Sequence, residues 1–133
     1  MDVSVYPDVA SGKRTSQKLL LVEDHAPTRL MMSRLIRDVG ALVVTARDGE
    51  EALRYLLQQK FDVLLTDLRM PVMDGFDLIA AVNELPPSHR PRRVIAISGE
   101  YEAGALRGVP SVSFMAKPFN LDTLLDMLGG KPN

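Results

Sequence analysis

Acidic side chains follow two apolar segments of the chain, at the point where each segment ends. Glu23 and Asp24 come directly after Lys18–Val22, and Asp67 closes the run that begins at Phe61. Short apolar runs of this kind are typical of strands buried on both faces of a sheet. If the two strands are parallel neighbours, their carboxyl ends bring three carboxylates together. Such carboxylates repel one another unless a cation intervenes, and oxygen ligands suit Mg²⁺.

A hydroxyl and an ammonium group occupy equivalent positions later in the chain. Ser98 ends the apolar segment Arg93–Ser98, and Lys117 follows Ser111–Ala116. Ligands of open α/β sheets bind outside the carboxyl ends of the strands. We therefore expect Ser98 and Lys117 to lie at the same edge as Asp67.

Each of these residues also has a simpler interpretation. The acidic pair after the first strand can favour the N-terminus of the next helix through the helix dipole. Asp67 can form a turn or a cap, Ser98 can be a polar strand end, and Lys117 can be a solvated charge. His25, beside Asp24, is interpreted as a surface histidine at a helix entrance rather than a phosphohistidine or a metal ligand. Four strand ends each carry a polar group, in the order acidic pair, carboxylate, hydroxyl and ammonium. This combination favours a shared site.

Composition narrows the class of protein. The 133 residues are 46% hydrophobic and 25% charged, with a formal net charge of −1. This is ordinary for one globular domain, and the near balance of charges argues against a basic surface that binds nucleic acid directly. There is no cysteine, which excludes disulfides and thiolate chemistry. The chain lacks a signal-peptide pattern and any apolar run of membrane-spanning length, so we expect a cytoplasmic protein.

Helical patterns alternate with the strands. The expected strands are Lys18–Val22, Leu42–Ala46, Phe61–Thr66, Arg93–Ser98 and Ser111–Ala116. Helices are expected to begin near Pro27, Gly49, Asp74 and Asn120. The second is expected to bury Ala52, Leu53, Leu56 and Leu57, and the third Phe76, Ile79, Ala80 and Val82. Five alternations with apolar strands predict a parallel sheet covered on both faces. Residues 1–17 are expected to be a flexible tail, 18–130 the domain, and 131–133 the C-terminal end.

Four motifs in this order, LLLVEDHAPTR, LLTDLRMPVMDG, IAISG and MAKPF, resemble the receiver domain of two-component response regulators. The resemblance covers Lys18 to about Gly130. It implies an α/β, flavodoxin-like, doubly wound sheet of five parallel strands in the order 2-1-3-4-5. It also implies a signalling phosphoprotein that catalyses only its own phosphorylation and dephosphorylation.

The resemblance implies a role for each matching residue. Asp67 is the expected phosphoacceptor. Asp24, Asp67 and the backbone carbonyl of Arg69 are the expected Mg²⁺ ligands, with Glu23 holding the metal through water. Lys117 and the Ser98 hydroxyl are expected to contact phosphoryl oxygens, and a cis peptide is expected before Pro118.

Three further residues are expected to tune the signal. Phe114 stands where many receivers have a switching tyrosine. Arg69 and Glu100 are expected to reach over the site and affect the phosphoryl lifetime, unless both are merely solvated charges.

The segment between Ser98 and Lys117 departs from the family pattern. Their separation of 19 positions is short, and Gly99, Gly104, Gly108 and Pro110 crowd the interval. We expect the fourth helix of the family to be short or absent here. The common dimer face is then in doubt, and dimerisation is expected to use another surface.

The expected partners are a histidine kinase or a histidine phosphotransfer protein, and a downstream protein target. Two alternatives are a degenerate receiver acting as an interaction module, and an aspartate-nucleophile phosphohydrolase. The second is disfavoured because such enzymes have an acid two residues after the nucleophile, where this chain has Arg69. No glycine-rich phosphate loop follows the first strand, which disfavours a nucleotide-binding protein. The sequence fits either a stand-alone receiver or a piece of a larger protein.

Overall fold

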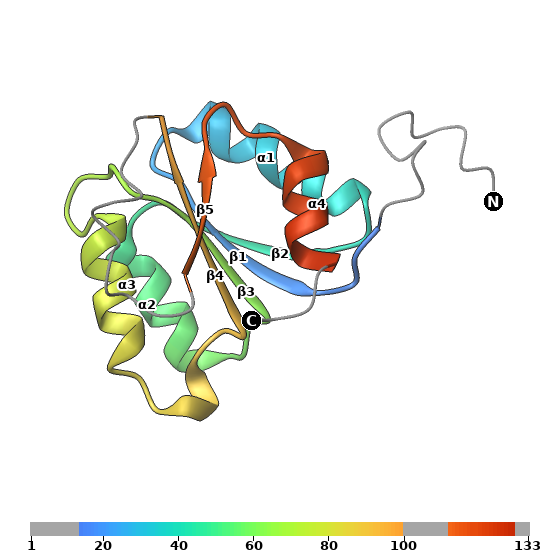
Figure 1. Cartoon of the computed structure of the whole chain (residues 1–133). Helices are drawn as coiled ribbons and strands as arrows, with labels where there is room; N and C mark the ends of the chain where they lie inside the picture. The colour runs from blue at the N-terminus through green and yellow to red at the C-terminus, as the bar shows by residue number, and fades with distance from the viewer. Residues whose placement is uncertain (1–13, 100–111, 130–133) are drawn as a thin grey trace.

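A five-stranded parallel sheet forms the centre of the protein (Figure 1). The computed structural model describes residues 14–99 and 112–129. The strand order is β2-β1-β3-β4-β5, which confirms the expected topology. The strands are β1 (Lys18–Val22), β2 (Leu42–Ala46), β3 (Val63–Asp67), β4 (Arg93–Ser98) and β5 (Val112–Ala116).

Helices cover both faces of this sheet. The described α-helices are α1 (Ala26–Asp38), α2 (Gly49–Gln58), α3 (Gly75–Asn83) and α4 (Leu121–Gly129), and a short 3₁₀ helix, η3, spans Pro87–His89. Figure 1 shows α1 and α4 on one face and α2 and α3 on the other. The family's helix between β4 and β5, expected to be short or absent, falls at positions outside the described residues. In the part of the chain that the structure describes, no helix has the length and apolar character needed to span a membrane.

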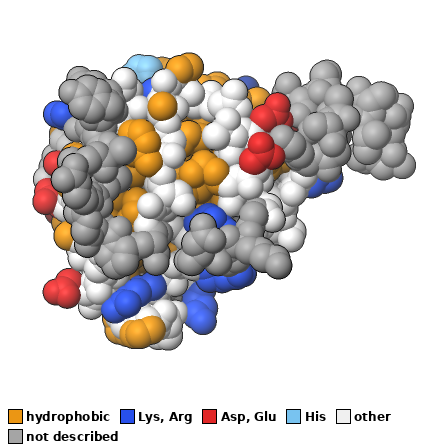
Figure 2. Space-filling model, viewed as in Figure 1, with side chains coloured by type: hydrophobic (Ala, Val, Ile, Leu, Met, Phe, Trp, Pro, Cys, Tyr) orange, Lys and Arg blue, Asp and Glu red, His pale blue; other side chains and the backbone are white. Residues whose placement is uncertain are grey.

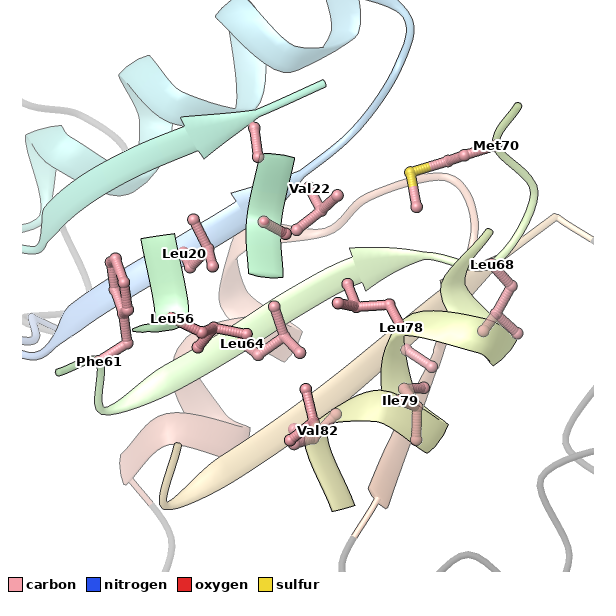
Figure 3. Close-up of a cluster of buried hydrophobic side chains, with 14 residues drawn as sticks. Leu20, Val22, Leu56, Phe61, Leu64, Leu68, Met70, Leu78, Ile79 and Val82 are labelled. Atoms are coloured by element: carbon pink, nitrogen blue, oxygen red, sulfur yellow. The ribbon is translucent and has the colours of Figure 1, made fainter. Parts of the chain in front are cut away.

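The sheet divides the hydrophobic core into two layers. Alternate residues of each strand point to opposite faces, so Leu20 and Leu64 face α2 and α3, while Leu19 and Leu65 face α1 and α4. Figure 3 shows the first layer, in which Leu56 lies beside the strand residues. The central strand β3 is buried along its whole length. The fold therefore delivers Asp67 from a rigid, fully packed strand.

In α2 and α3, two apolar residues predicted to be buried are exposed. Leu57 of α2 has 58% of its surface exposed, and Ala80 of α3 is also exposed. Each lies about 100° around its helix from a buried neighbour, which is Leu56 or Ile79. Both helices carry runs of consecutive apolar residues, so composition alone did not fix which residues face the sheet. Leu78, absent from the predicted apolar face, is fully buried.

Side-chain caps begin the first three helices. The Asp48 side chain accepts from the Glu51 amide at 2.8 Å, and Asp74 accepts from the Asp77 amide at 2.9 Å. His25 caps α1 as a histidine at the helix entrance, accepting from the Thr28 amide. These caps start α1, α2 and α3 at the edge of the sheet that carries the acidic residues.

The last residues of the expected tail are attached to the domain. The Thr15 amide donates to the Val39 carbonyl at 2.9 Å, and the Gln17 side chain donates to the Leu128 carbonyl at 3.1 Å. Position 40 requires glycine, because its φ is 109° and a Cβ would lie 2.5 Å from the Thr15 oxygen. The rest of the tail lies outside the described residues.

The α2 cap leads to a stability prediction. Replacing Asp48 by alanine removes the acceptor for the Glu51 amide, and the free energy of unfolding is expected to fall by about 1 kcal/mol. Chemical denaturation of wild type, Asp48→Ala and Asp48→Ser measures this change. The serine variant retains a capping oxygen and should lose much less; equal losses in both variants would contradict the capping role.

Candidate functional site

Three carboxylates converge at the carboxyl ends of β1 and β3. Asp67 is the last residue of β3, and Glu23 and Asp24 directly follow β1. Because β1 and β3 pair in parallel, with Val22 opposite Thr66, both strands end at one level. One carboxylate oxygen from each of the three residues lies within 4.8 Å of the others. This oxygen-only donor set fits a hard divalent cation such as Mg²⁺.

Lys117 brings the positive charge to this site. Its Nζ donates to Oδ2 of Asp67 at 2.8 Å. The Lys117 amide donates to the Ser98 carbonyl at 2.8 Å, so the end of β4 holds the backbone from which the lysine reaches. The peptide bond between Lys117 and Pro118 is cis, as expected. The residues around Asp67 thus come from the ends of four strands.

The backbone of β3 fixes the position of the Asp67 carboxylate. Asp67 pairs with Ile97 of β4, and the Leu68 amide donates to the Ile97 carbonyl at 3.1 Å. Oδ1 of Asp67 accepts from the Arg69 amide at 3.1 Å, while Oδ2 binds Lys117. Only 4% of the Asp67 surface is exposed. The carboxylate is therefore oriented from both sides before any ligand arrives.

Two glycines let the loop after β3 pack closely. Gly75 lies so near the end of β3 that a Cβ would stand 2.3 Å from the Asp67 carbonyl oxygen. A Cβ on Gly49 would stand 2.7 Å from the Met73 side chain, and the Gly49 amide donates to the Met73 carbonyl at 3.1 Å. Within this loop Val72 adopts a φ of 68°. The start of α2 and the start of α3 together hold the loop that contains Arg69.

Electrostatics at the site shift two titrating groups. Burial raises the pKa of Glu23 to about 7; its bond from the His25 amide opposes the shift, and the nearby Asp67 and Asp24 carboxyls add to it. For Lys117, burial lowers the pKa, but the hydrogen bond and charge of Asp67 outweigh it and the net shift is upward. Glu23 thus holds its proton to higher pH than a free carboxyl group does, while Lys117 stays charged near neutral pH.

The raised pKa of Glu23 gives a stability prediction. A carboxyl whose pKa rises on folding binds more protons in the folded state, so its contribution is lost as pH rises from about 4.5 through about 7. Glu23→Gln mimics the protonated form and should be more stable than the wild type at pH 8, on the order of 2 kcal/mol, and nearly equal at pH 4. Denaturation of both proteins across this range, without Mg²⁺, measures the difference. A difference independent of pH would contradict the assignment.

The other residues predicted to belong to the site differ in how deeply they are buried. Ser98 is buried at the end of β4. Phe114 of β5 is partly buried and packs against the core layer on the α2 and α3 side. Arg69 is exposed. Glu100 lies outside the described residues, so its predicted pairing with Arg69 remains a prediction.

An open cavity of about 440 Å³ adjoins the acidic cluster. Its lining includes Glu23, Lys117, Met31, Met32 and Phe119. It is bounded by α1 and the segment after β5, so a small molecule has room beside the lysine.

Basic residues gather at the opposite end of the sheet from the acidic cluster, where Arg90, Arg92 and Arg93 precede or begin β4. Figure 2 shows this Lys and Arg surface at the lower end of the molecule.

Two contributions to the site were not predicted from the sequence. Gly49 was interpreted only as a helix start, although it also lies against Met73. Arg29 donates to the Glu23 carbonyl at 2.8 Å and was given no role. A signal for the second was present, since Arg29 stands one turn into a helix that directly follows the acidic pair.

Comparison with known proteins agrees with this geometry. A family model of the response regulator receiver domain matches residues 19–129. The chain belongs to the response regulator receiver family. This receiver domain is 30% identical over 111 residues to a response regulator receiver protein of Anaeromyxobacter, covering 84% of this chain and 47% of that protein. It is 28% identical over 117 residues to the sensory/regulatory protein RpfC of Xanthomonas campestris, covering 85% of this chain and 16% of that protein. The receiver domain thus spans less than half the length of these two relatives.

Solved receiver structures share the fold. Chemotaxis protein CheY4 of Vibrio cholerae is 33% identical, with a TM-score of 0.77 over 86% of this chain and 97% of that one. The receiver domain of sensor histidine kinase PA1611 from Pseudomonas aeruginosa is 27% identical, with a TM-score of 0.74 over 86% and 95% of the two chains. That structure has a magnesium ion coordinated in its active-site cleft. The acidic cluster of this receiver domain has the donor types for the same ion.

Proposed function

We propose that this receiver domain accepts a phosphoryl group on Asp67 in a Mg²⁺-dependent reaction, and that the modification switches its contacts with other proteins. The observation that carries the proposal is the 2.8 Å contact between Lys117 Nζ and Oδ2 of Asp67, beside two further carboxylates. A buried carboxylate with a lysine on one oxygen and an amide on the other is held ready as a nucleophile.

The reaction transfers one phosphoryl group. An oxygen of the Asp67 carboxylate forms a bond to phosphorus, while the bond from phosphorus to the nitrogen of a phosphohistidine breaks. The nitrogen leaves with the bonding electron pair and regains a proton from solvent, and Asp67 becomes an acyl phosphate. Lys117 donates to a phosphoryl oxygen and offsets the negative charge there. The Ser98 hydroxyl binds a second phosphoryl oxygen after transfer.

Bound Mg²⁺ would neutralise charge on the phosphoryl oxygens and on the acidic cluster. Asp24 and Asp67 would hold it through their carboxylates, Arg69 through its backbone carbonyl, and Glu23 through water. The carboxylates supporting this assignment lie within 4.8 Å of one another. Binding the ion would favour ionised Glu23, since the cation replaces the proton that burial otherwise retains.

The proposed partners follow from the phosphoryl chemistry. A histidine kinase or a histidine phosphotransfer protein would supply the phosphoryl group, and a downstream protein would recognise the modified surface. Support comes from relatives such as hybrid signal transduction histidine kinase B of Dictyostelium discoideum, which is 31% identical over 126 residues. Phe114, at the edge strand β5, is the side chain proposed to change environment with the phosphoryl group.

The direct test is the intact mass of the protein after incubation with acetyl phosphate or phosphoramidate and Mg²⁺. Wild type is expected to gain the mass of one phosphoryl group, and Asp67→Asn is expected to gain none. Asp77→Asn is the matched control, because Asp77 is an exposed acid on α3. The gain should disappear when Mg²⁺ is chelated. A wild type that gains no mass with either donor would overturn the proposal and favour a phosphorylation-independent interaction module.

A further inference from the structure

The guanidinium of Arg29 binds the backbone of both acidic residues that follow β1. Its Nη1 donates to the Glu23 carbonyl at 2.8 Å and lies 3.4 Å from the Asp24 carbonyl. Arg29 is half-buried in the first turn of α1, and its own amide donates to the His25 carbonyl at 2.9 Å. Side chains on a helix lean toward its N-terminus, so an arginine one turn into α1 reaches back over the preceding turn.

The turn after β1 has to resist a repulsive force. The carboxylates of Glu23, Asp24 and Asp67 lie within 4.8 Å, and their mutual repulsion pushes this turn away from β3. A turn that is to present ionised carboxylates therefore needs support from its backbone.

Other contacts hold different parts of the same turn. The Glu23 amide donates to the Ala46 carbonyl at 3.0 Å, and the Glu23 carboxylate accepts from the His25 amide at 2.9 Å. Arg29 holds the remaining backbone group of Glu23, its carbonyl, and reaches the carbonyl of Asp24 as well. The peptide plane between these two residues sets the direction in which the Asp24 side chain leaves the backbone.

We propose that Arg29 is a positioning residue for the metal ligands of the site: by binding the Glu23 and Asp24 carbonyls it keeps the Asp24 carboxylate directed at the ion. Arg29 acts through the backbone and touches neither the ion nor the phosphoryl group. Arginine suits this role because its planar fork offers several fixed donors, whereas a lysine is a single flexible charge. The inference deepens the proposed function and rests on Mg²⁺ binding at Asp24.

The test compares Mg²⁺ binding by wild type, Arg29→Gln, Arg29→Lys and Arg34→Gln. Arg34 is an exposed arginine of the same helix and serves as the matched control. Titration calorimetry with Mg²⁺ alone gives the dissociation constant, and thermal unfolding in a chelator gives the stability of each metal-free variant. Arg29→Gln is expected to raise the dissociation constant about tenfold, as the loss of outer-shell partners does in other metal sites. Arg29→Lys should fall between this variant and wild type, and Arg34→Gln should match wild type.

Phosphorylation kinetics provide a second readout that a purely structural arginine would not affect. The rate with acetyl phosphate should fall in Arg29→Gln at limiting Mg²⁺ and recover to near the wild-type rate at saturating Mg²⁺. Arg29→Gln with wild-type Mg²⁺ affinity, or with a rate that saturating Mg²⁺ does not restore, would overturn the positioning role. If the glutamine variant does not fold, Arg29→Lys, which keeps a charged donor, is compared with wild type instead.

The two proposals fail in different ways. A wild type that binds Mg²⁺ with Arg29-dependent affinity but takes no phosphoryl group would leave the positioning role intact and remove the phosphoacceptor function. If wild type and the three variants are phosphorylated equally well at every Mg²⁺ concentration, the phosphoacceptor function stands and the positioning role of Arg29 fails.

Discussion

Replacing Lys117 by methionine is expected to slow the phosphorylation of Asp67 by acetyl phosphate at least about a hundredfold. Loss of one positioned donor to a developing charge typically lowers a rate by about 10²–10³. The lysine lies 2.8 Å from Oδ2 of Asp67, so its ammonium can reach a phosphoryl oxygen attached to that carboxylate. Methionine keeps much of the length of the side chain and removes only the charge and its donors.

The rate is measured from the intact mass against time at fixed acetyl phosphate and saturating Mg²⁺. Lys60→Met is the matched control, because Lys60 is exposed and lies in the segment before β3, at the other end of that strand. Its rate should equal that of wild type. A Lys117→Met protein that is phosphorylated at the wild-type rate would show that the ammonium has no part in the transfer.

The second large effect is expected from Gly75→Ala. The added Cβ would stand 2.3 Å from the Asp67 carbonyl oxygen and 2.7 Å from the Leu68 Cα, both backbone atoms that cannot turn aside as a side chain can. The Gly75 amide also donates to the Leu68 carbonyl at 3.1 Å, so relief requires α3 to move away from β3. We expect the free energy of unfolding to fall by about 3 kcal/mol, the upper part of the usual range for overpacking.

Gly129→Ala provides the control for this substitution. Gly129 ends α4, and a Cβ there would meet nothing within 4 Å. Alanine at that position should be neutral or slightly stabilising. Urea denaturation of the three proteins tests the difference. Equal stability of Gly75→Ala and wild type would mean that the loop after β3 adapts freely, and would weaken the view that Asp67 is held rigidly.

The strands and their order were the most predictable part of this protein. The apolar runs that form β1, β3 and β4 are too short for typical helices and end in polar residues, and this length favours buried strands. The topology then brings Glu23, Asp67 and Lys117 to one edge without further information. The side of each helix that faces the sheet was less predictable. In α2 and α3 apolar residues stand next to each other, and of two adjacent leucines Leu56 is buried while Leu57 is exposed.

Contacts between a side chain and a distant backbone group were the least predictable part. The approach of Gly49 to Met73 depends on how α2 meets the loop after β3, which no local pattern encodes. The contact of Arg29 with the Glu23 carbonyl is closer in sequence, but arginines on helix surfaces are common and most are solvated. The place of Arg29 one turn after the acidic pair is a sequence signal, and the three-dimensional structure shows the contact that it makes.

Val72 has a consequence for how this domain tolerates sequence change. It is a β-branched residue with a φ of 68° and 76% of its surface exposed, so the strain of its backbone is not offset by burial of its side chain. Glycine or asparagine adopts this conformation at lower cost. Position 72 is therefore a natural location for an intragenic suppressor, a second mutation that restores a chain weakened elsewhere, as by Asp48→Ala, while leaving every proposed metal ligand in place.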